Sequence, residues 1–225
     1  MTRARNRPIT DAVTTFHPHH RRLLACGILA PVVALAATLA AVIAYPGFDH
    51  SRQYLSELGG AKARLPQIFN VGVFAAGVMA ALAGAGFGLA IHALTRAKIT
   101  AGVIVVVFLL SGWGLTQAAL YVWPDPRHLA INLALGIQLA PLLLLWGLRT
   151  RSDLRGLKLF LAVAFVAMAV LTLLTKHLLF PGLVNDANVG WWERGYAVIL
   201  VGWVGVAAFL LERRLAFERP APKTD

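Results

Sequence analysis

Long apolar runs alternate with short polar segments along most of the chain. A helix that crosses a bilayer needs about 20 predominantly apolar residues, and six runs approach or exceed this length. They cover residues 23–45, 66–93, 99–122, 129–148, 158–179 and 196–212. The pattern therefore predicts an all-α fold, a polytopic membrane bundle with six transmembrane helices.

The first run follows a basic segment, as the apolar core of a signal peptide also does. A signal-peptide core spans about 7–15 residues and ends at a cleavage site. This run is longer and leads directly into PGFDH at 46–50, so we expect a retained membrane anchor. The predicted organisation is a disordered basic cytoplasmic tail at 1–22, a membrane domain at 23–212 and a cytoplasmic tail at 213–225.

The composition agrees with a membrane protein. The chain is 58% hydrophobic and 14% charged, whereas a soluble domain has about 25% charged residues. The net charge is +11, and fifteen of the 21 Lys and Arg residues lie on the N-terminal side of the predicted membrane. The positive-inside rule then places both termini in the cytoplasm. The basic excess reflects topology and attraction to anionic lipid, so we expect no nucleic-acid partner.

A polar stretch, PGFDHSRQYLSELGG at 46–60, follows the first run. It predicts a short interfacial helix of about two turns that Asp49 or Ser51 caps and that Gly59 or Gly60 ends. In a regular helix His50 and a carboxylate seven residues later lie about 10 Å apart along the axis. We therefore expect His50 and Glu57 not to share one metal ion.

Two further polar segments are predicted on the same outer side. In YVWPDPRH at 121–128, Asp125 is expected to cap the next helix, with an acidic side chain as the simplest partner for His128. In the segment 176–194, Lys176 and His177 close the fifth run, and Glu193 and Arg194 precede the sixth.

Small and polar residues inside the runs predict how the helices pack. Five glycines in the second run favour close helix approach: Gly72, Gly77, Gly84, Gly86 and Gly88. Polar residues in the outer halves of the runs predict interhelical hydrogen bonds or the floor of a polar cavity: Asn70, Gln117, Asn132 and Thr175. The single cysteine, Cys26, excludes an intramolecular disulfide.

Four motifs in order resemble a known family: YPGFDHSRQYLSELGG, IFNVGVFAAG, WPDPRH and GWWERG. Together, over about residues 25–212, they are similar to the bacterial six-span membrane proteins of domain-of-unknown-function family 998, which is distantly similar to the DRAM/Frag-type membrane proteins. The resemblance implies a bacterial inner membrane and no settled activity. It carries over these positions: Ser56, Glu57, Gly59, Asn70, Pro124, Asp125, His128, Glu193 and Arg194.

The outer polar residues leave three functions open. Recognition of a membrane lipid headgroup or a small polar ligand would use His50, Arg52, Glu57, Asn70, Asp125, His128, His177, Glu193 and Arg194. A lipid-hydrolysing or lipid-remodelling enzyme would use Ser56, Glu57, His128 or Glu193, and a zinc ion would need ligands such as His50, Asp125, His128 and His177. A structural role with an unknown protein partner is the third.

Overall fold

The computed structural model describes residues 18–122 and 125–217. The expectations for the outer parts of both tails and for Pro124 lie outside these ranges. Within the described ranges the chain is helical, and six helices are long and apolar enough to cross a membrane. The predicted six-span, all-α fold is confirmed, and it makes the chain a multi-pass membrane protein.

Five of the spans are single long helices. They are α2 (Pro18–Ile43), α3 (Pro66–Thr95), α4 (Lys98–Leu120), α7 (Arg155–Thr175) and α8 (Val189–Phe217). The fourth span consists of short segments, namely η2 (Pro126–Ala130), α5 (Ile131–Ala134), η3 (Leu135–Leu139) and α6 (Ala140–Gly147). Two further short 3-10 helices, η1 (Leu55–Gly59) and η4 (Ser152–Leu154), lie in connections.

The fourth span changes helix type for a reason that the sequence contains. Pro141 has no N–H group and cannot donate to the carbonyl of Ile137. The N–H of Ala140 donates to that carbonyl instead, which is the i→i+3 bond of a 3-10 helix. The tighter 3-10 turn therefore ends just where α6 begins.

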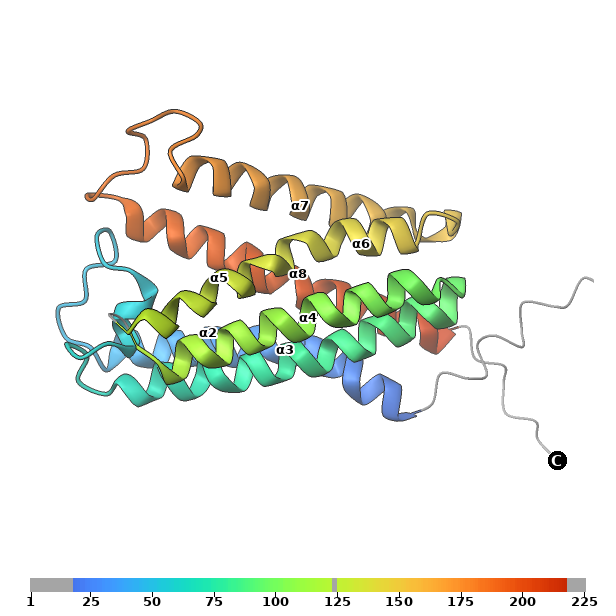
Figure 1. Cartoon of the computed structure of the whole chain (residues 1–225), viewed down its shortest axis with the longest axis horizontal. Coiled ribbons are helices and arrows are strands. Elements are labelled where there is room, and N and C mark those ends of the chain that lie inside the picture. The colour runs from blue at the N-terminus through green and yellow to red at the C-terminus, as the bar shows by residue number, and fades with distance from the viewer. Residues whose placement is uncertain (1–17, 123–124, 218–225) are drawn as a thin grey trace, which may run out of the picture.

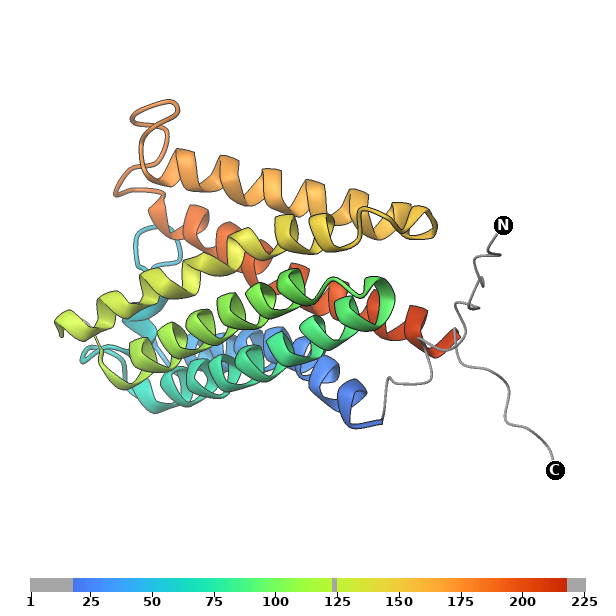
Figure 2. The same cartoon turned by 45° about the vertical axis from the view of Figure 1, so that its right-hand side comes forward.

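The spans form a ring in which each packs against its neighbours in sequence. α2 packs on α3, α3 on α4, α4 on the fourth span, α6 on α7 and α7 on α8, and α2 contacts α8 to close the ring. Figures 1 and 2 show the helices running roughly side by side, with the long connections gathered at one end. We call this the loop end, and the opposite end, where α2 begins and α8 finishes, the terminal end.

The glycines predicted to permit close packing do so. A Cβ atom on Gly77 would lie 2.8 Å from the carbonyl oxygen of Gly112 in α4, and one on Gly88 would lie 2.6 Å from Cγ2 of Val105. Added Cβ atoms on Gly72, Gly84 and Gly86 would overlap α2 or α4. The first three spans therefore approach to backbone contact.

The interior of the ring is apolar. The rings of Phe87 and Phe108 stack with centroids 5.1 Å apart, and Trp203 of α8 lies 6.1 Å from Phe108. Beside them lies a cavity of about 50 Å³ whose lining includes Pro31, Ala76, Ala134 and Val204, with Ser111 as a polar member. The Ser111 hydroxyl bonds to the carbonyl of Val107. Among the described residues that line this cavity, a charged or strongly polar ligand would meet only the Ser111 side chain as a polar partner.

The last span begins earlier than its hydropathy suggests. α8 starts at Val189 rather than at residue 196, so Glu193 and Arg194 lie inside the helix and do not precede it. The N–H of Val189 donates to the carbonyl of Asn185 at 2.8 Å, and the N–H of Ala187 donates to Oδ1 of Asn185 at 3.0 Å. This asparagine turn starts the helix in a stretch too polar for a hydropathy window to include.

Ion pairs tie the helices at the terminal end. Arg21 of α2 pairs with Glu212 of α8, with Nε 2.7 Å from Oε1. Asp153 pairs with Arg151 at 2.8 Å and with Arg214 of α8 at 2.5 Å. Residues 18–22, predicted as part of the tail, belong to α2.

Candidate functional site

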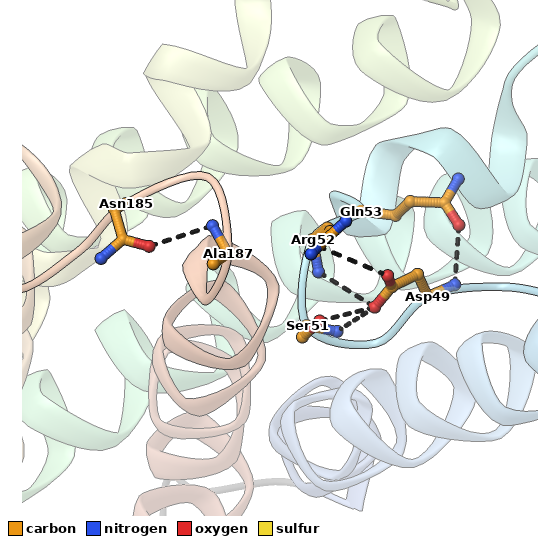
Figure 3. A network of polar contacts seen from close by, with 6 residues as sticks. All are labelled: Asp49, Ser51, Arg52, Gln53, Asn185 and Ala187. Carbon is orange, nitrogen blue, oxygen red and sulfur yellow. Dashed lines mark hydrogen bonds and ion pairs between the residues drawn. The ribbon is translucent and has the colours of Figure 1, made fainter.

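The loop after α2 opens with a turn built on one aspartate. Oδ1 of Asp49 accepts hydrogen bonds from the N–H of Ser51 at 2.9 Å and from its hydroxyl at 2.6 Å. Figure 3 shows these contacts, with the turn of Asn185 and Ala187 across from them. The hydroxyl of Ser51, followed by its N–H, holds the pKa of Asp49 below its ordinary value. The aspartate is therefore a charged cap of its own turn.

The predicted two-turn helix at 49–60 does not form, and only Leu55–Gly59 is helical, as η1. Side chains take the N–H groups that an α-helix would need. The N–H of Tyr54 donates to Oε1 of Glu57 at 2.9 Å, and the N–H of Leu55 donates to Oε2 of Glu193 at 2.6 Å. Since each N–H has one proton to give, these bonds replace the i→i−4 bonds to residues 50 and 51.

Three contacts attach the same loop to the start of α8. The carbonyl of Ser51 accepts from the N–H of Gly190 at 2.7 Å. The carbonyl of Gln53 accepts from Nη1 of Arg194 at 3.0 Å, and the Glu193 carboxylate holds the N–H of Leu55, as above. Alternate residues of the loop, 51, 53 and 55, thus bond to the first turns of α8. These loop residues and their partners in α8, together with Asp49 and Glu57, form what we call the loop-end cluster. Its members are Asp49, Ser51, Gln53, Leu55, Glu57, Gly190, Glu193 and Arg194.

Gln53 connects the two carboxylates of the loop. Its Oε1 accepts from the N–H of Asp49 at 2.7 Å, and its Nε2 donates to Oε2 of Glu57 at 2.9 Å. Glu57 therefore receives one bond from the backbone and one from a side chain. Both carboxylates act as acceptors that shape the loop.

Two glycines permit the close contacts around the cluster. The carbonyl of Gly59 accepts from Nδ2 of Asn70 in α3 at 3.1 Å, and a Cβ atom on Gly59 would overlap Oδ1 of Asn70. A Cβ atom on Gly190 would lie 2.5 Å from the carbonyl oxygen of His50 and 2.9 Å from that of Gln53. The two motif residues Gly59 and Asn70 therefore contact each other directly.

Aromatic rings cover one side of the cluster. His50 stacks on Trp191 with centroids 5.8 Å apart and meets the edge of Phe48 at 5.4 Å. The Arg194 guanidinium carbon lies 5.1 Å from the centre of the Phe48 ring. Phe48 is buried with Leu58, whereas Trp191 is 59% exposed. The surface of the loop-end cluster thus combines the exposed Trp191 ring with the partly covered guanidinium of Arg194.

The segment at 125–128 is held by contacts of its own. Asp125 caps η2, as predicted, because its Oδ1 accepts from the N–H of Arg127 at 2.8 Å, and Arg127 Nη2 pairs with Oδ2 at 2.7 Å. Hydrogen bonds from Arg127, chiefly from its side chain and then from its backbone N–H, lower the pKa of Asp125. The expected acidic partner of His128 is wrong, because Nδ1 of His128 lies 2.9 Å from the carbonyl of Tyr121.

His128 also reaches the carbonyl of Ala118 at 3.1 Å. The last carbonyls of a helix lack intrahelical partners, so this histidine completes the end of α4. His177 lies after α7 with a φ of 57° and an exposed side chain. Arg52 is exposed beside Asp49, with Nε 4.0 Å from its carboxylate. Arg52 thus adjoins the loop-end cluster through Asp49, whereas the contacts described for His128 and His177 do not join these two residues to Glu57, Glu193 and Arg194.

The candidate catalytic and zinc residues lie partly in the loop-end cluster and partly outside it. Among residues 18–122 and 125–217, no three or more His, Cys, Asp or Glu side chains gather as a set that could hold a metal ion. His50 is stacked between aromatic rings, and His128 binds backbone carbonyls through Nδ1. Glu57 and Glu193 accept backbone N–H groups, and half-buried Ser56 lies in η1. Zinc binding and catalysis stay predictions.

A family model describes this architecture. The model of DUF998, a protein family of unknown function, matches residues 28–210, which include the loop-end cluster and nearly all of the six spans. The chain belongs to this family. No curated protein matches the chain, and no solved structure matches it. Family membership agrees with the resemblance of the four motifs and leaves the activity open.

Motif positions of the DUF998 resemblance explain part of the cluster. Glu57, Gly59, Asn70, Glu193 and Arg194 bind one another's segments through backbone groups. Sequence reasoning missed the roles of Gly190 and Gln53, although the spacing of Asp49, Gln53 and Glu57 at four-residue steps was a signal that they interact. It had no signal for the backbone carbonyls that Arg194 binds.

Proposed function

We propose that the protein recognises an oxyanion, the phosphate or carboxylate of a membrane lipid headgroup or of a small polar ligand, at the loop-end cluster. The observation that carries this proposal is the state of the Arg194 guanidinium. Nη1 donates to the carbonyls of Gln53 and Gly190. Nη2 is buried and has no hydrogen-bond acceptor within the described residues.

A buried donor without an acceptor costs about 1–3 kcal/mol, and more when the group is charged. A guanidinium prefers oxyanions that accept from two of its nitrogens. Arg194 is half-buried as a whole, so the side chain is partly accessible from the surface of the loop end. The exposed aromatic surface and Arg52 suit a headgroup region, where Trp and basic side chains are favoured.

The proposal includes the orientation and the membrane. The loop end faces the outer side of a bacterial inner membrane, and both termini face the cytoplasm. The supporting observation is the excess of Lys and Arg on the N-terminal side in the sequence, together with the even number of spans, since six spans bring the start of α2 and the end of α8 to the same end of the bundle. In this orientation the cluster meets lipid headgroups of the outer leaflet.

Replacing Arg194 with glutamine is expected to abolish preferential binding of anionic lipid at the loop end, because the cation and the free donor are both lost. Native mass spectrometry of the purified protein with phosphatidylglycerol and with phosphatidylcholine measures this preference, and inorganic phosphate as competitor separates a lipid headgroup from a free anion. Arg127→Gln is the matched control, since the Arg127 guanidinium is already paired with Asp125.

Arg194→Lys keeps the charge on a single nitrogen and tests binding if the glutamine variant unfolds. Since one ammonium group serves the carbonyls of Gln53 and Gly190 less well than the planar guanidinium and leaves no fixed second donor, we expect weaker binding of phosphatidylglycerol by a folded protein. A folded Arg194→Gln protein with an unchanged preference, or a wild-type protein that binds both lipids equally, would contradict the proposal.

A further inference from the structure

A groove lies between α3 and α4 at the terminal end, away from the loop-end cluster. It has a volume of about 380 Å³, and its lining includes Gly88, His92, Lys98, Ala101, Gly102 and Val105. α3 and α4 run side by side and join in a tight turn at this end (Figures 1 and 2). The groove therefore follows the seam of one helical hairpin.

Glycines create the groove. Gly88 is packed so closely that its added Cβ would lie 2.6 Å from Val105 and 2.9 Å from the carbonyl oxygen of Ala101. Gly102, by contrast, has no atom within 4 Å of an added Cβ. A glycine with open space above it, beside a tightly packed seam, leaves a channel in the surface of the hairpin.

The end of the groove nearest the hairpin turn is basic. His92 lies in the last turn of α3, Lys98 begins α4, and Arg96 between them ends α3 with a φ of 60° and an exposed side chain. Nδ1 of His92 is buried without a hydrogen-bond partner within the described ranges. The turn itself contains no acidic residue.

The carboxylate of Asp153, in the connection between α6 and α7, is already paired. Asp153 pairs with both Arg151 and Arg214. Arg151 also donates to the carbonyl of Leu94. The positive charge of the hairpin turn therefore has no acidic residue within its own turn. An anion from outside the chain would meet Lys98 and Arg96 without displacing a carboxylate.

The rest of the groove is apolar and faces lipid. Seven residues separate Lys98 from Val105, which is about 10 Å along α4. On the same helix Ile99 is 85% exposed and Val103 is 42% exposed, as expected for side chains that contact acyl chains. The groove thus runs from a basic end at the membrane surface to an apolar end within the bilayer.

We propose that this groove binds one anionic phospholipid of the leaflet at the terminal end. The phosphate lies against Lys98, Arg96 and His92, and one acyl chain lies over Gly102 toward Val105. Basic pockets between transmembrane helices bind anionic headgroups in this way. The site is separate from the loop-end cluster and takes its lipid from the opposite leaflet.

Gly102→Leu tests the site directly, because an added Cβ has no atom within 4 Å and the leucine side chain would occupy space in the groove. Native mass spectrometry with phosphatidylglycerol is expected to show about tenfold weaker binding at one lipid site. Gly156→Leu is the matched control at the same end, since an added Cβ on Gly156 also has open space, and it is expected to bind as wild type. Lys98→Gln is expected to weaken phosphatidylglycerol binding about fivefold and to leave phosphatidylcholine binding unchanged.

Unchanged phosphatidylglycerol binding by Gly102→Leu would overturn the proposal. Equal weakening by Gly156→Leu, or a wild-type protein that binds phosphatidylcholine as tightly as phosphatidylglycerol, would overturn it as well. Arg194→Gln removes only the lipid of the loop end, so that Gly102→Leu in an Arg194→Gln background still removes one further lipid if the groove is a site.

Discussion

Glu193→Ala is expected to destabilise the protein by about 1–3 kcal/mol, the usual cost of a buried hydrogen-bonding group left without a partner. Its carboxylate accepts the N–H of Leu55 at 2.6 Å, across 138 positions of sequence. Without it that N–H loses its acceptor, and the 51–55 stretch loses one of its three attachments to α8. Thermal unfolding of the purified protein in detergent measures the effect.

Two variants separate this contact from a general effect of lost charge. Glu193→Gln keeps an acceptor oxygen for the N–H of Leu55, so it is expected to lose less stability than Glu193→Ala. It is still expected to be less stable than wild type, because a neutral acceptor forms a weaker bond than a carboxylate. Asp186→Ala removes an exposed carboxylate from the connection before α8 and is expected to unfold as wild type. Equal losses for Asp186→Ala and Glu193→Ala would show that the bond to Leu55 contributes nothing.

Gly112→Ala is expected to destabilise the bundle by about 1–3 kcal/mol through overpacking. The added Cβ would overlap the carbonyl oxygen of Gly77 and lie 2.9 Å from Cβ of Ala81. Backbone atoms cannot move aside as a flexible side chain can, so α3 and α4 must separate. Unfolding in a denaturing detergent, followed by circular dichroism, measures the loss.

The matched control is Gly202→Ala in the middle of α8, where an added Cβ has no atom within 4 Å. Alanine favours a helix over glycine by about 1 kcal/mol, so this variant is expected to be as stable as wild type or more so. Gly112→Ala is thus expected to lower the stability of the protein, whereas Gly202→Ala is not. Stability changes of the same sign and size would contradict the packing described for α3 and α4.

The spans were predictable because bilayer thickness fixes how many apolar residues a helix needs. The close packing of α3 followed from its glycines, which have no side chain to hold a neighbouring helix away. The cap at Asp125 followed from local chemistry, since the aspartate and the N–H that it binds are two residues apart. Each of these features depends on residues that are close in sequence.

The loop-end cluster depends on residues that are far apart. Local spacing favours a helix at 49–60, and it fails because Glu193, from another span, takes the N–H of Leu55. His128 needed a partner, but carbonyls at the end of α4 provide it, and every residue has a carbonyl. The early start of α8 depends on a turn at Asn185 that hydropathy does not register. Because every residue has a backbone carbonyl, the amino-acid types in the sequence do not indicate which backbone groups will form tertiary contacts.

The attachment of the loop to α8 is tested most directly by hydrogen–deuterium exchange at the Leu55 amide, followed by NMR in detergent micelles. The bond to Glu193 predicts slow exchange at Leu55 in the wild-type protein and fast exchange in Glu193→Ala, with amides in the middle of α3 unchanged. A Leu55 amide that exchanges equally fast in both proteins would contradict the loop-end cluster.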